Sequence, residues 1–560
     1  AIESIRGNKK VNINITIAGS PEVIGHVRDV NNKRIIYFIT NFAGNDAENI
    51  RKITRAKGAG SNHNGSEITY NNSSTDNCII AMYNVATDTT HTLLEGAWLN
   101  FSKNHLITGA QVIDDLLFFT DDYNQPRKIN IAKCLDHPNG NYYQFEDQIS
   151  VAKYAPYLPI RLTDNAGVSG SSRDGTITSE YMKDKFIRFS YRYKFEDGEY
   201  SLMAPFTQIV FEPLNNSIIS NTEDQTNQVS GEPDVVVDKH TIYRTGKVNI
   251  MQNKINKVLL RIPVPNINER DDSADYSSNA AYSNDYKIQS IDILVKESDG
   301  VSIKLVKTIT LKDTQNSDFE HYTEKFKSNG QTYHRQVLKH TYKSQKPFQV
   351  LPEDQLTRVF DQVPIRAKSL DIVSNRLVFG NYIENYDYPL DFSGKKGINF
   401  TLGQSAKGDG LISTATHGHI RHDEFAYKYH SLKQRRTYQV GIVFADKYGR
   451  QSPVILSSSE NDDSDTLTIN PSHDNKSSKF NNAYSWSDSQ AAYGLAMKIL
   501  FQDTQLFKSN SDIYDSEFNA GYNPHGWYSW RLVVKQTQQE YYNVYTSHPF
   551  QNWDNIENEP

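Results

Sequence analysis

Short segments in which apolar and polar residues alternate constrain this chain most. Phe186-Ile-Arg-Phe-Ser-Tyr-Arg-Tyr-Lys-Phe195 places its aromatic and polar side chains on mostly opposite faces of an extended strand, and Val11-Asn-Ile-Asn-Ile-Thr-Ile17 alternates throughout. Such alternation predicts strands with one face buried and one face in water. Capped helical periodicity is scarce, and an aromatic share of 11% suits the surfaces of sheets. The sequence therefore predicts an all-β protein.

Length and charge narrow the possible classes of protein. At about 100–200 residues per domain, the 560 residues predict three or four domains. The formal net charge is -6, which argues against a nucleic-acid-binding protein, because affinity for phosphate comes from Lys and Arg. Apolar runs such as Ile35–Ile39 and Leu116–Phe119 fall far short of the ~20 residues that span a bilayer. Cys78 and Cys134 lack partners at metal-ligand spacing, so we expect two buried thiols.

A short repeated unit indicates hairpins of similar construction. It occurs in Val30-Asn-Asn-Lys-Arg-Ile-Ile-Tyr-Phe38, in Val112-Ile-Asp-Asp-Leu-Leu-Phe-Phe119 and in Ile372-Val-Ser-Asn-Arg-Leu-Val-Phe379. Each copy has a polar turn pair followed by an apolar and aromatic strand. This pattern is typical of the hairpins in propeller blades, and we expect propeller-like sheets here.

A longer repeated unit indicates two further modules. Phe189 to Pro205, with a turn at Glu196-Asp-Gly198, matches Val440 to Pro453, with a turn at Asp446-Lys-Tyr-Gly449. Strands rich in β-branched residues follow both copies. We therefore predict two inserted or appended sandwich modules of immunoglobulin or fibronectin type.

These patterns predict four regions along the chain. Residues 1–180 form a propeller-like β region, 181–345 a first sandwich with long loops, 346–429 a return to the propeller-like region, and 430–560 a second sandwich. The chain opens on Ala1 and closes on a polar run, so we expect both ends to be trimmed from a longer protein and the second sandwich to be incomplete.

One segment contains candidate metal ligands. His417 and His419 would point to the same side of a strand, and His422 with Glu424 could complete a site. The alternative is a solvated loop, because no second cluster stands at a fixed spacing. We predict no cofactor, and the motif for a phosphate-binding loop is missing.

Paired acids raise the possibility of a glycosidase. Asp114-Asp115 and Asp121-Asp122 each supply two carboxylates, but adjacent residues in a strand point to opposite faces and cannot together grip one sugar. Aspartate is common in turns because it bonds its own backbone, so we expect turn roles for both pairs. The sequence thus predicts that the protein is not an enzyme.

Four segments resemble the tail nozzle, or muzzle, proteins of crAss-like short-tailed bacteriophages. The most specific is Leu351 to Tyr382, with a Phe-Asp-x-Val-Pro turn and an Asn-Arg-Leu-Val-Tyr-Gly-Asn-Tyr strand, in which Phe379 replaces the usual Tyr. The others are Tyr191 to Ser201, Leu117 to Asn130 and Ala1 to Asn8. The structural positions that the resemblance singles out, together with the second turn, are Asp197, Gly198, Pro364, Asn375, Arg376, Gly380, Tyr382, Asp446 and Gly449.

The resemblance implies a structural protein of the virion. Such proteins form a homo-oligomeric ring, usually a hexamer, at the distal end of the tail, where they close the channel and open it for genome ejection. The partners implied are copies of the same chain, neighbouring hub, ring or fibre proteins, and genomic DNA that passes without specific binding. An acidic balance suits such a conduit, since phosphate-binding stripes would slow the DNA.

Three alternatives stay open. Related hub and ring proteins share some of these segments, so the position within the tail is less defined than the tail itself. A carbohydrate-binding adhesin could use Trp527, Tyr528 and Trp530, although the two Trp residues lie on opposite faces of a predicted strand, so that one of them belongs to the core. A capsule- or wall-degrading enzyme would require a convergent acid pair or a nucleophile.

Overall fold

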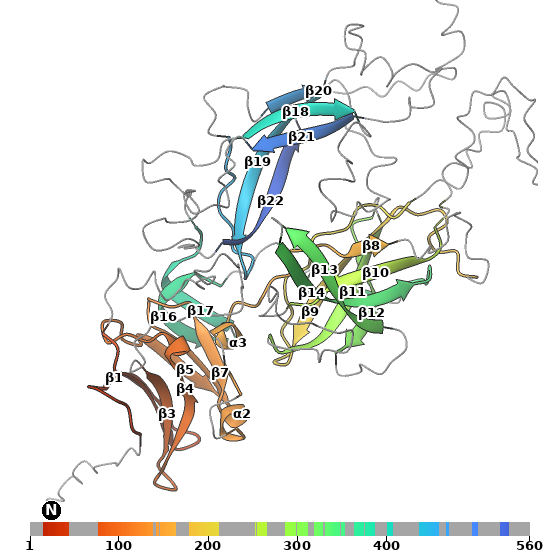
Figure 1. Cartoon of the computed structure of the whole chain (residues 1–560). Coiled ribbons are helices and arrows are strands. Elements are labelled where there is room, and N and C mark those ends of the chain that lie inside the picture. The colour runs from red at the N-terminus through yellow and green to blue at the C-terminus, as the bar shows by residue number, and fades with distance from the viewer. Residues whose placement is uncertain are drawn as a thin grey trace, which may run out of the picture.

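Antiparallel strands dominate the computed structural model of the chain (Figure 1). The residues it describes, to which the statements below refer, are 15–43, 77–137, 142–144, 146–163, 178–211, 253, 255–265, 286–297, 300–311, 319–328, 331–347, 349–352, 355, 363–374, 376–386, 400–406, 436–457, 466–469, 495–501 and 527–536. The prediction of an all-β protein is confirmed. None of the helices described is long and apolar enough to cross a membrane.

Two sheets near the N-terminus pack face to face. The first is a meander of β1 (Glu22–Asp29), β2 (Arg34–Thr40), β3 (Cys78–Asn84) and β4 (Thr89–Glu95). The second consists of β5 (Gly109–Ile113), β6 (Leu116–Thr120) and β7 (Arg127–Asn130). The rings of Phe38, Phe101 and Phe119 meet between the sheets, with centroids 5.0–6.1 Å apart. Three short helices flank this core: η1 (Ala97–Leu99), α2 (Ile131–Leu135) and α3 (Glu146–Ile149).

A hairpin from far along the chain covers the other face of the second sheet. It consists of β16 (Arg366–Val373) and β17 (Arg376–Ile383). The hydroxyl of Thr120 donates to the carbonyl of Ala367 over 2.6 Å, and a Cβ on Gly109 would lie 2.7 Å from the backbone nitrogen of Leu370. Since Ala110, next to Gly109, packs toward the first sheet, the second sheet lies between the first sheet and the hairpin.

The three copies of the short repeat form hairpins in these stacked sheets, with a longer turn in the first copy than in the other two. Each turn contains a non-glycine residue in the left-handed region: Lys33 (φ 53°), Asp114 (φ 50°) and Ser374 (φ 48°). Adjacent turns also touch, because the guanidinium of Arg34 donates to the carbonyl of Asp114 over 2.8 Å.

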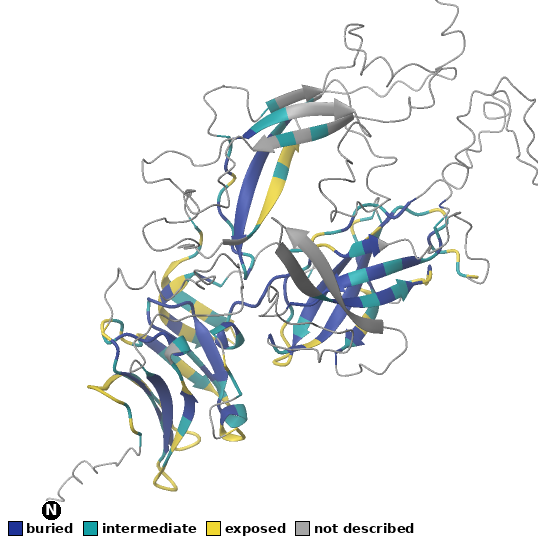
Figure 2. Cartoon of the chain, viewed as in Figure 1, coloured by how far each residue is buried: buried dark blue, intermediate teal, exposed yellow. Residues whose placement is uncertain are grey.

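Two further four-stranded sheets share the largest hydrophobic core. One has the order β13-β14-β10-β8, and the other has the order β15-β12-β11-β9. Their strands are β8 (Arg161–Thr163), β9 (Ile187–Phe195), β10 (Val258–Pro263), β11 (Ile288–Glu297), β12 (Ile303–Thr310), β13 (Phe319–Ser328), β14 (Gln331–Tyr342) and β15 (Gln349–Val350). Alternate residues of β9, β10 and β11 point into this core and are buried (Figure 2).

The C-terminal strands form two smaller sheets. β18 (Phe400–Ala406) pairs with β21 (Leu495–Phe501), and β19 (Arg436–Asp446) lies between β20 (Thr466–Ile469) and β22 (Trp527–Gln536). Phe400, Val440, Ile442, Phe444 and Ile455 make a separate core between them. We call the strands β18 to β22 the C-terminal sheets, and the strands β8 to β15 the first sandwich.

Candidate functional site

The two copies of the longer repeat have the same hydrogen-bond pattern. In the first, the hydroxyl of Ser201 accepts the N–H of Tyr193 over 2.9 Å and donates to the next carbonyl. In the second, Ser452 does the same with Phe444 over 3.0 Å. Each buried serine thus joins the returning chain to its strand. The turns themselves, residues 196–199 and 446–450, extend from the ends of β9 and β19.

Both turns dock on one segment of the N-terminal region, which we call the platform and which consists of residues 125–137, 142–144 and 146–155. The platform has fixed ends: the carbonyl of Pro126 accepts the N–H of Val151 over 3.0 Å. The guanidinium of Arg127, which is 1% exposed, reaches the carboxylate of Glu146 over 2.9 Å. Asn130 caps α2 by accepting the N–H of Lys133. These bonds lie within the platform, so they fix the side chains that contact the turns independently of the turns themselves.

The first turn docks through ion pairs. The ammonium of Lys153 lies 2.6 Å from the carboxylate of Asp197, and that of Lys128 lies 3.0 Å from Asp197 and 2.5 Å from Glu199. Burial lowers the pKa of Lys153, and the charge of Lys128 lowers it further. Burial alone would raise the pKa of Asp197, but the charges of Lys153 and Lys128 outweigh it and hold this pKa well below its usual value. The first junction is therefore an acidic turn held by two buried lysines.

The second turn contains both an acidic residue, Asp446, and the basic residue that pairs with it, Arg450. The carboxylate of Asp446 accepts the backbone N–H groups of Tyr448 and Arg450, and the guanidinium of Arg450 donates to it over 2.7 Å. Burial disfavours the charge of Arg450, but Asp446 outweighs that cost and raises its pKa. Tyr386, which follows β17, donates its hydroxyl to the same carboxylate over 3.0 Å.

Polar contacts connect the second turn to the platform and to the hairpin. The hydroxyl of Tyr448 donates to Asp147 over 2.6 Å and accepts from the amide of Gln125 over 2.7 Å. Burial and the charge of Asp147 raise the pKa of Tyr448 well above its usual value. Arg450 also donates to the carbonyl of Pro364 over 3.0 Å, and Lys447 forms an ion pair with Asp147. The second turn thus binds the platform, Pro364 before β16 and Tyr386 after β17.

The residues singled out by the resemblance fall into three places. Asp197 and Gly198 lie at the first junction, whereas Pro364, Asp446 and Gly449 come together at the second. Arg376, Gly380 and Tyr382 lie on β17, away from both junctions, and Tyr382 is 51% exposed. Asn375 is outside the described residues.

Sequence reasoning missed the platform side of the junctions. Gln125 and Lys128 lie within the segment Leu117 to Asn130, but nothing in that segment marked them as partners of the turns. Asp147 and Lys153 had no signal of their own, because their partners Tyr448 and Asp197 are far away in the sequence, 301 residues in the case of Asp147.

The candidate metal ligands His417, His419, His422 and Glu424 lie outside the described residues. Within the described part of the chain, no three His, Cys, Asp or Glu side chains gather into a possible metal site. Both cysteines are buried, as predicted, and neither forms a disulfide; burial raises the pKa of Cys134 to about 12.

The paired acids occupy turns, as predicted. Asp114 has a left-handed φ of 50° between β5 and β6, and Asp122 has a φ of 55°. Asp121 is buried and accepts the N–H groups of Tyr123 and Asn124 over 3.1 and 2.7 Å. The carboxylate of Asp121 thus stabilises the backbone, and that of Asp115 accepts the guanidinium of Arg34 over 3.2 Å.

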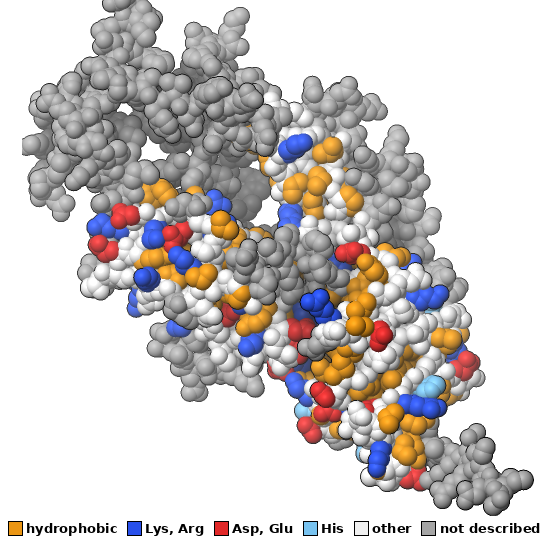
Figure 3. Space-filling view, turned by 180° about the vertical axis from the view of Figure 1, so that it is seen from behind, with side chains coloured by type: hydrophobic (Ala, Val, Ile, Leu, Met, Phe, Trp, Pro, Cys, Tyr) orange, Lys and Arg blue, Asp and Glu red, His pale blue; other side chains and the backbone are white. Residues whose placement is uncertain are grey.

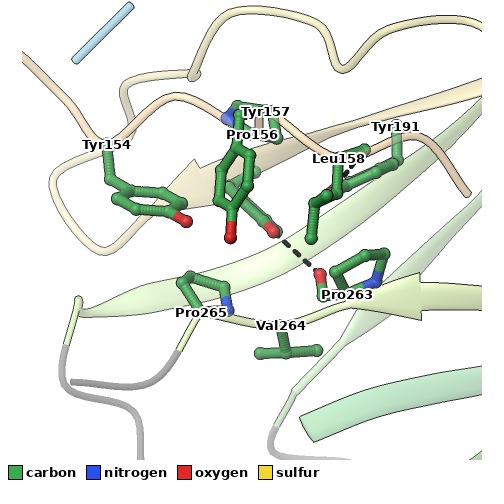
Figure 4. A pocket seen from close by; sticks show the side chains of 9 residues that line it. Tyr154, Pro156, Tyr157, Leu158, Tyr191, Pro263, Val264 and Pro265 are labelled. Carbon is green, nitrogen blue, oxygen red and sulfur yellow. Dashed lines mark hydrogen bonds between the residues drawn. The ribbon is translucent and has the colours of Figure 1, made fainter. Parts of the chain in front are cut away.

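A small depression in the first sandwich is lined by tyrosines and prolines (Figure 4). It encloses about 200 Å³ including open solvent, which is below the roughly 300–1,000 Å³ of most ligand sites. The hydroxyls of Tyr191 and Tyr193 already donate to the carbonyls of Leu158 and Pro263, over 3.0 and 2.8 Å. The bond to Leu158 holds the segment that follows the platform against the sandwich, and the bond to Pro263 lies within the sandwich, so the depression is a packing feature.

The surface combines mixed charge with exposed apolar residues. On the face shown in Figure 3, Lys and Arg side chains lie scattered among Asp and Glu. Along β22, Trp530, Leu532 and Val534 are 45%, 38% and 55% exposed, and they stand opposite Phe444, Ile442 and Val440 of β19. The face of β22 that continues the C-terminal core is therefore exposed at these positions (Figure 2).

No protein-family model matches the chain, and no curated protein matches it.

Proposed function

We propose that the chain is a structural subunit of a phage tail, the nozzle protein whose ring closes the distal end of the channel and opens for genome ejection. In this proposal the stacked sheets are propeller-like blades, and the two modules are immunoglobulin- or fibronectin-like sandwiches. The subunit assembles with copies of itself, usually six, and contacts hub, ring or fibre proteins. The proposal assigns the protein no reaction and no cofactor, and it places the protein in the virion.

One observation supports this proposal beyond the resemblance. Two equivalent turns, from two different modules, dock on one platform through satisfied buried polar groups, such as Lys153 with Asp197 and Tyr448 with Asp147. Buried polar contacts of this kind fix the orientation of modules more than they add stability. A subunit of a ring needs such fixed orientations, because small errors in angle prevent a ring from closing.

The mixed surface charge fits a conduit. With a net charge of -6 and Lys and Arg interspersed with acids on the face in Figure 3, passing DNA finds no continuous basic stripe there. Each phosphate neutralised by a basic side chain would add salt-dependent affinity and slow ejection.

An electron cryo-microscopy map of the virion tail tests the proposal. We expect this chain in a closed ring at the distal end, with the first sandwich and the C-terminal sheets at fixed angles to the stacked sheets. A ring at a higher level of the tail would identify a hub or ring protein instead. Finding the chain in the capsid, or only as a monomer in virions, would contradict the proposal.

A carbohydrate-binding tail adhesin is the second candidate, and the exposed indole of Trp530 favours it. Aromatic faces stack on sugars, so Trp530→Ala would abolish binding to a glycan array. Tyr382→Ala is the matched control, because Tyr382 is similarly exposed at 51% but lies on β17. Binding that survives Trp530→Ala would show that Trp530 is not the sugar contact, and absence of glycan binding by the wild-type protein would remove this candidate.

A further inference from the structure

We propose that the second turn, Asp446–Arg450, is a releasable joint through which the C-terminal sheets detach from the rest of the molecule while staying folded. The first sandwich, in contrast, is attached permanently. The two turns have the same hydrogen-bond pattern, so the difference lies in what surrounds each of them.

The first sandwich shares its hydrophobic core with the platform. Tyr154, at the platform's end, is 5% exposed and is a member of that core. Its ring lies 4.6 Å from the ring of Tyr286 and 6.2 Å from that of Tyr193. Separating this module would expose aromatic surface to water, which is costly at ~25 cal/mol per Å².

The C-terminal core is separate from the others. Its buried members all come from β18, β19 and the return after the second turn, and none comes from the platform. At the second junction itself, Gly449 lies against Leu202 and Ala155, and the side chain of Tyr448 is buried at 3% exposure. Detachment therefore breaks no hydrophobic core among the described residues.

The bonds across the second junction are polar and replaceable by water. The N–H of Ala155 donates to the carbonyl of Lys447 over 2.9 Å, and Tyr448 bonds Asp147 and Gln125. Folding exchanges such bonds against bonds to water, so the net cost of opening each is small. Junctions between modules that are small and polar permit relative motion.

The charges differ between the two junctions. At the second, Asp446 keeps Arg450 and two backbone N–H groups when the turn leaves, and one buried carboxylate, that of Asp147, loses Lys447 and the hydroxyl of Tyr448. Opening the first junction would instead take Asp197 and Glu199 away from Lys128 and Lys153, which are 8–9% exposed. Removing the partners of buried charges is strongly unfavourable.

In the proposed tail ring, the C-terminal sheets would be the moving part that opens the channel, a step that rests on the proposed function. The joint itself is a property of the single chain. It can therefore be tested on the purified full-length protein, whatever its place in a virion.

Hydrogen exchange measured by mass spectrometry separates detachment from unfolding, because three amides report on different places. The N–H of Ala155 is bonded across the joint, that of Ile455 within the C-terminal core, and that of Ala204 within the first sandwich. We expect Ala155 to exchange faster than the other two. Tyr448→Phe, which removes one hydroxyl, should speed exchange at Ala155 about tenfold or more and leave Ile455 and Ala204 unchanged.

The matched control is Tyr142→Phe, which removes a hydroxyl that bonds Glu196 at the first junction over 3.0 Å. It should leave Ala155 at the wild-type rate. The inference is overturned if Ala155 and Ile455 exchange together in the wild-type protein, since the sheets then unfold when they leave. It is equally overturned if Tyr448→Phe leaves Ala155 unchanged or speeds Ala155 and Ile455 to the same extent.

Discussion

Two glycines show how equal backbone geometry can have unequal consequences. Gly198 and Gly449 occupy equivalent places in the two turns, with φ angles of 85° and 84°. An ideal Cβ on Gly198 would meet nothing within 4 Å, whereas one on Gly449 would lie 2.7 Å from Leu202 and 3.1 Å from Ala155. The same residue type is thus required once by conformation alone and once by conformation and packing.

We predict that Gly198→Ala lowers the free energy of unfolding of its module by about 1–2 kcal/mol, the cost of a left-handed alanine. Gly449→Ala should cost about 1 kcal/mol more, because the new methyl group is also forced against Leu202 and Ala155. Thermal unfolding of both variants beside the wild type measures the difference. Equal losses would show that the second turn does not pack as described.

For single residues, the sequence predicted those whose role depends on their neighbours in the chain. The Asp and Gly of each turn were visible because a turn is built from neighbouring residues. Lys153 and Gln125 were not, because their partners Asp197 and Tyr448 lie far along the chain, 323 residues away for Gln125. Nothing in the pattern around a lysine tells which distant carboxylate it meets.

Among the elements, the hairpin β16–β17 depends on one close approach. Gly109 on β5 leaves room for the backbone of β16, since its Cβ would lie 2.7 Å from the nitrogen of Leu370. We predict that Gly109→Ala displaces the hairpin and costs about 1–3 kcal/mol in the N-terminal region. The control is Gly300→Ala, where the nearest atoms are 3.7 Å away and stability should change by less than about 0.5 kcal/mol. Equal melting temperatures for the two variants would contradict the packing.

The docking of the first turn should weaken as the pH falls. Because the charges of Lys153 and Lys128 hold the pKa of Asp197 well below its usual value, the ionised form of Asp197 stabilises the folded state above the pKa of an unfolded aspartate, about 3.9. This contribution, on the order of 1 kcal/mol after screening, is lost as the pH falls below about 4. Urea unfolding between pH 7 and pH 2 should show this loss in the wild type and not in Asp197→Asn. Asp371→Asn, on the exposed side of β16, should keep the wild-type profile.

The alternation of apolar and polar residues predicted where strands occur, but it did not predict which elements pack together. The short repeat predicted hairpins, and all three occur. That β16 packs on β5 could not be predicted, because the interface consists of a glycine and backbone carbonyls such as that of Ala367, which carry no sequence pattern.

For the whole molecule, separate cores predict separate unfolding. The core of the first sandwich has 24 described buried members, one of which is Tyr154 of the platform, and the core of the C-terminal sheets has five. We predict at least two calorimetric transitions, with the C-terminal sheets melting first, since stability follows the apolar area buried. A single transition with equal calorimetric and van't Hoff enthalpies would contradict this.

The overall plan was partly accessible from the sequence. The longer repeat indicated two similar modules, and the structure gives both copies the same turn. The shared core of the first sandwich also takes in residues such as Tyr154 and Leu162, which come before residue 181. Such additions escape a pattern search because a three-residue strand like β8 is too short to show alternation.

The bond from Thr120 to Ala367 spans 247 residues of sequence. During synthesis, the face of the second sheet that contains Gly109 and Thr120 therefore waits until the hairpin has left the ribosome. The first sandwich, whose strands lie between, is complete by then and can fold as a unit, because domains fold in the order in which they emerge. The N-terminal sheets are thus synthesised before the first sandwich but complete their packing after it. Their folding rate is limited by the closing of a long loop.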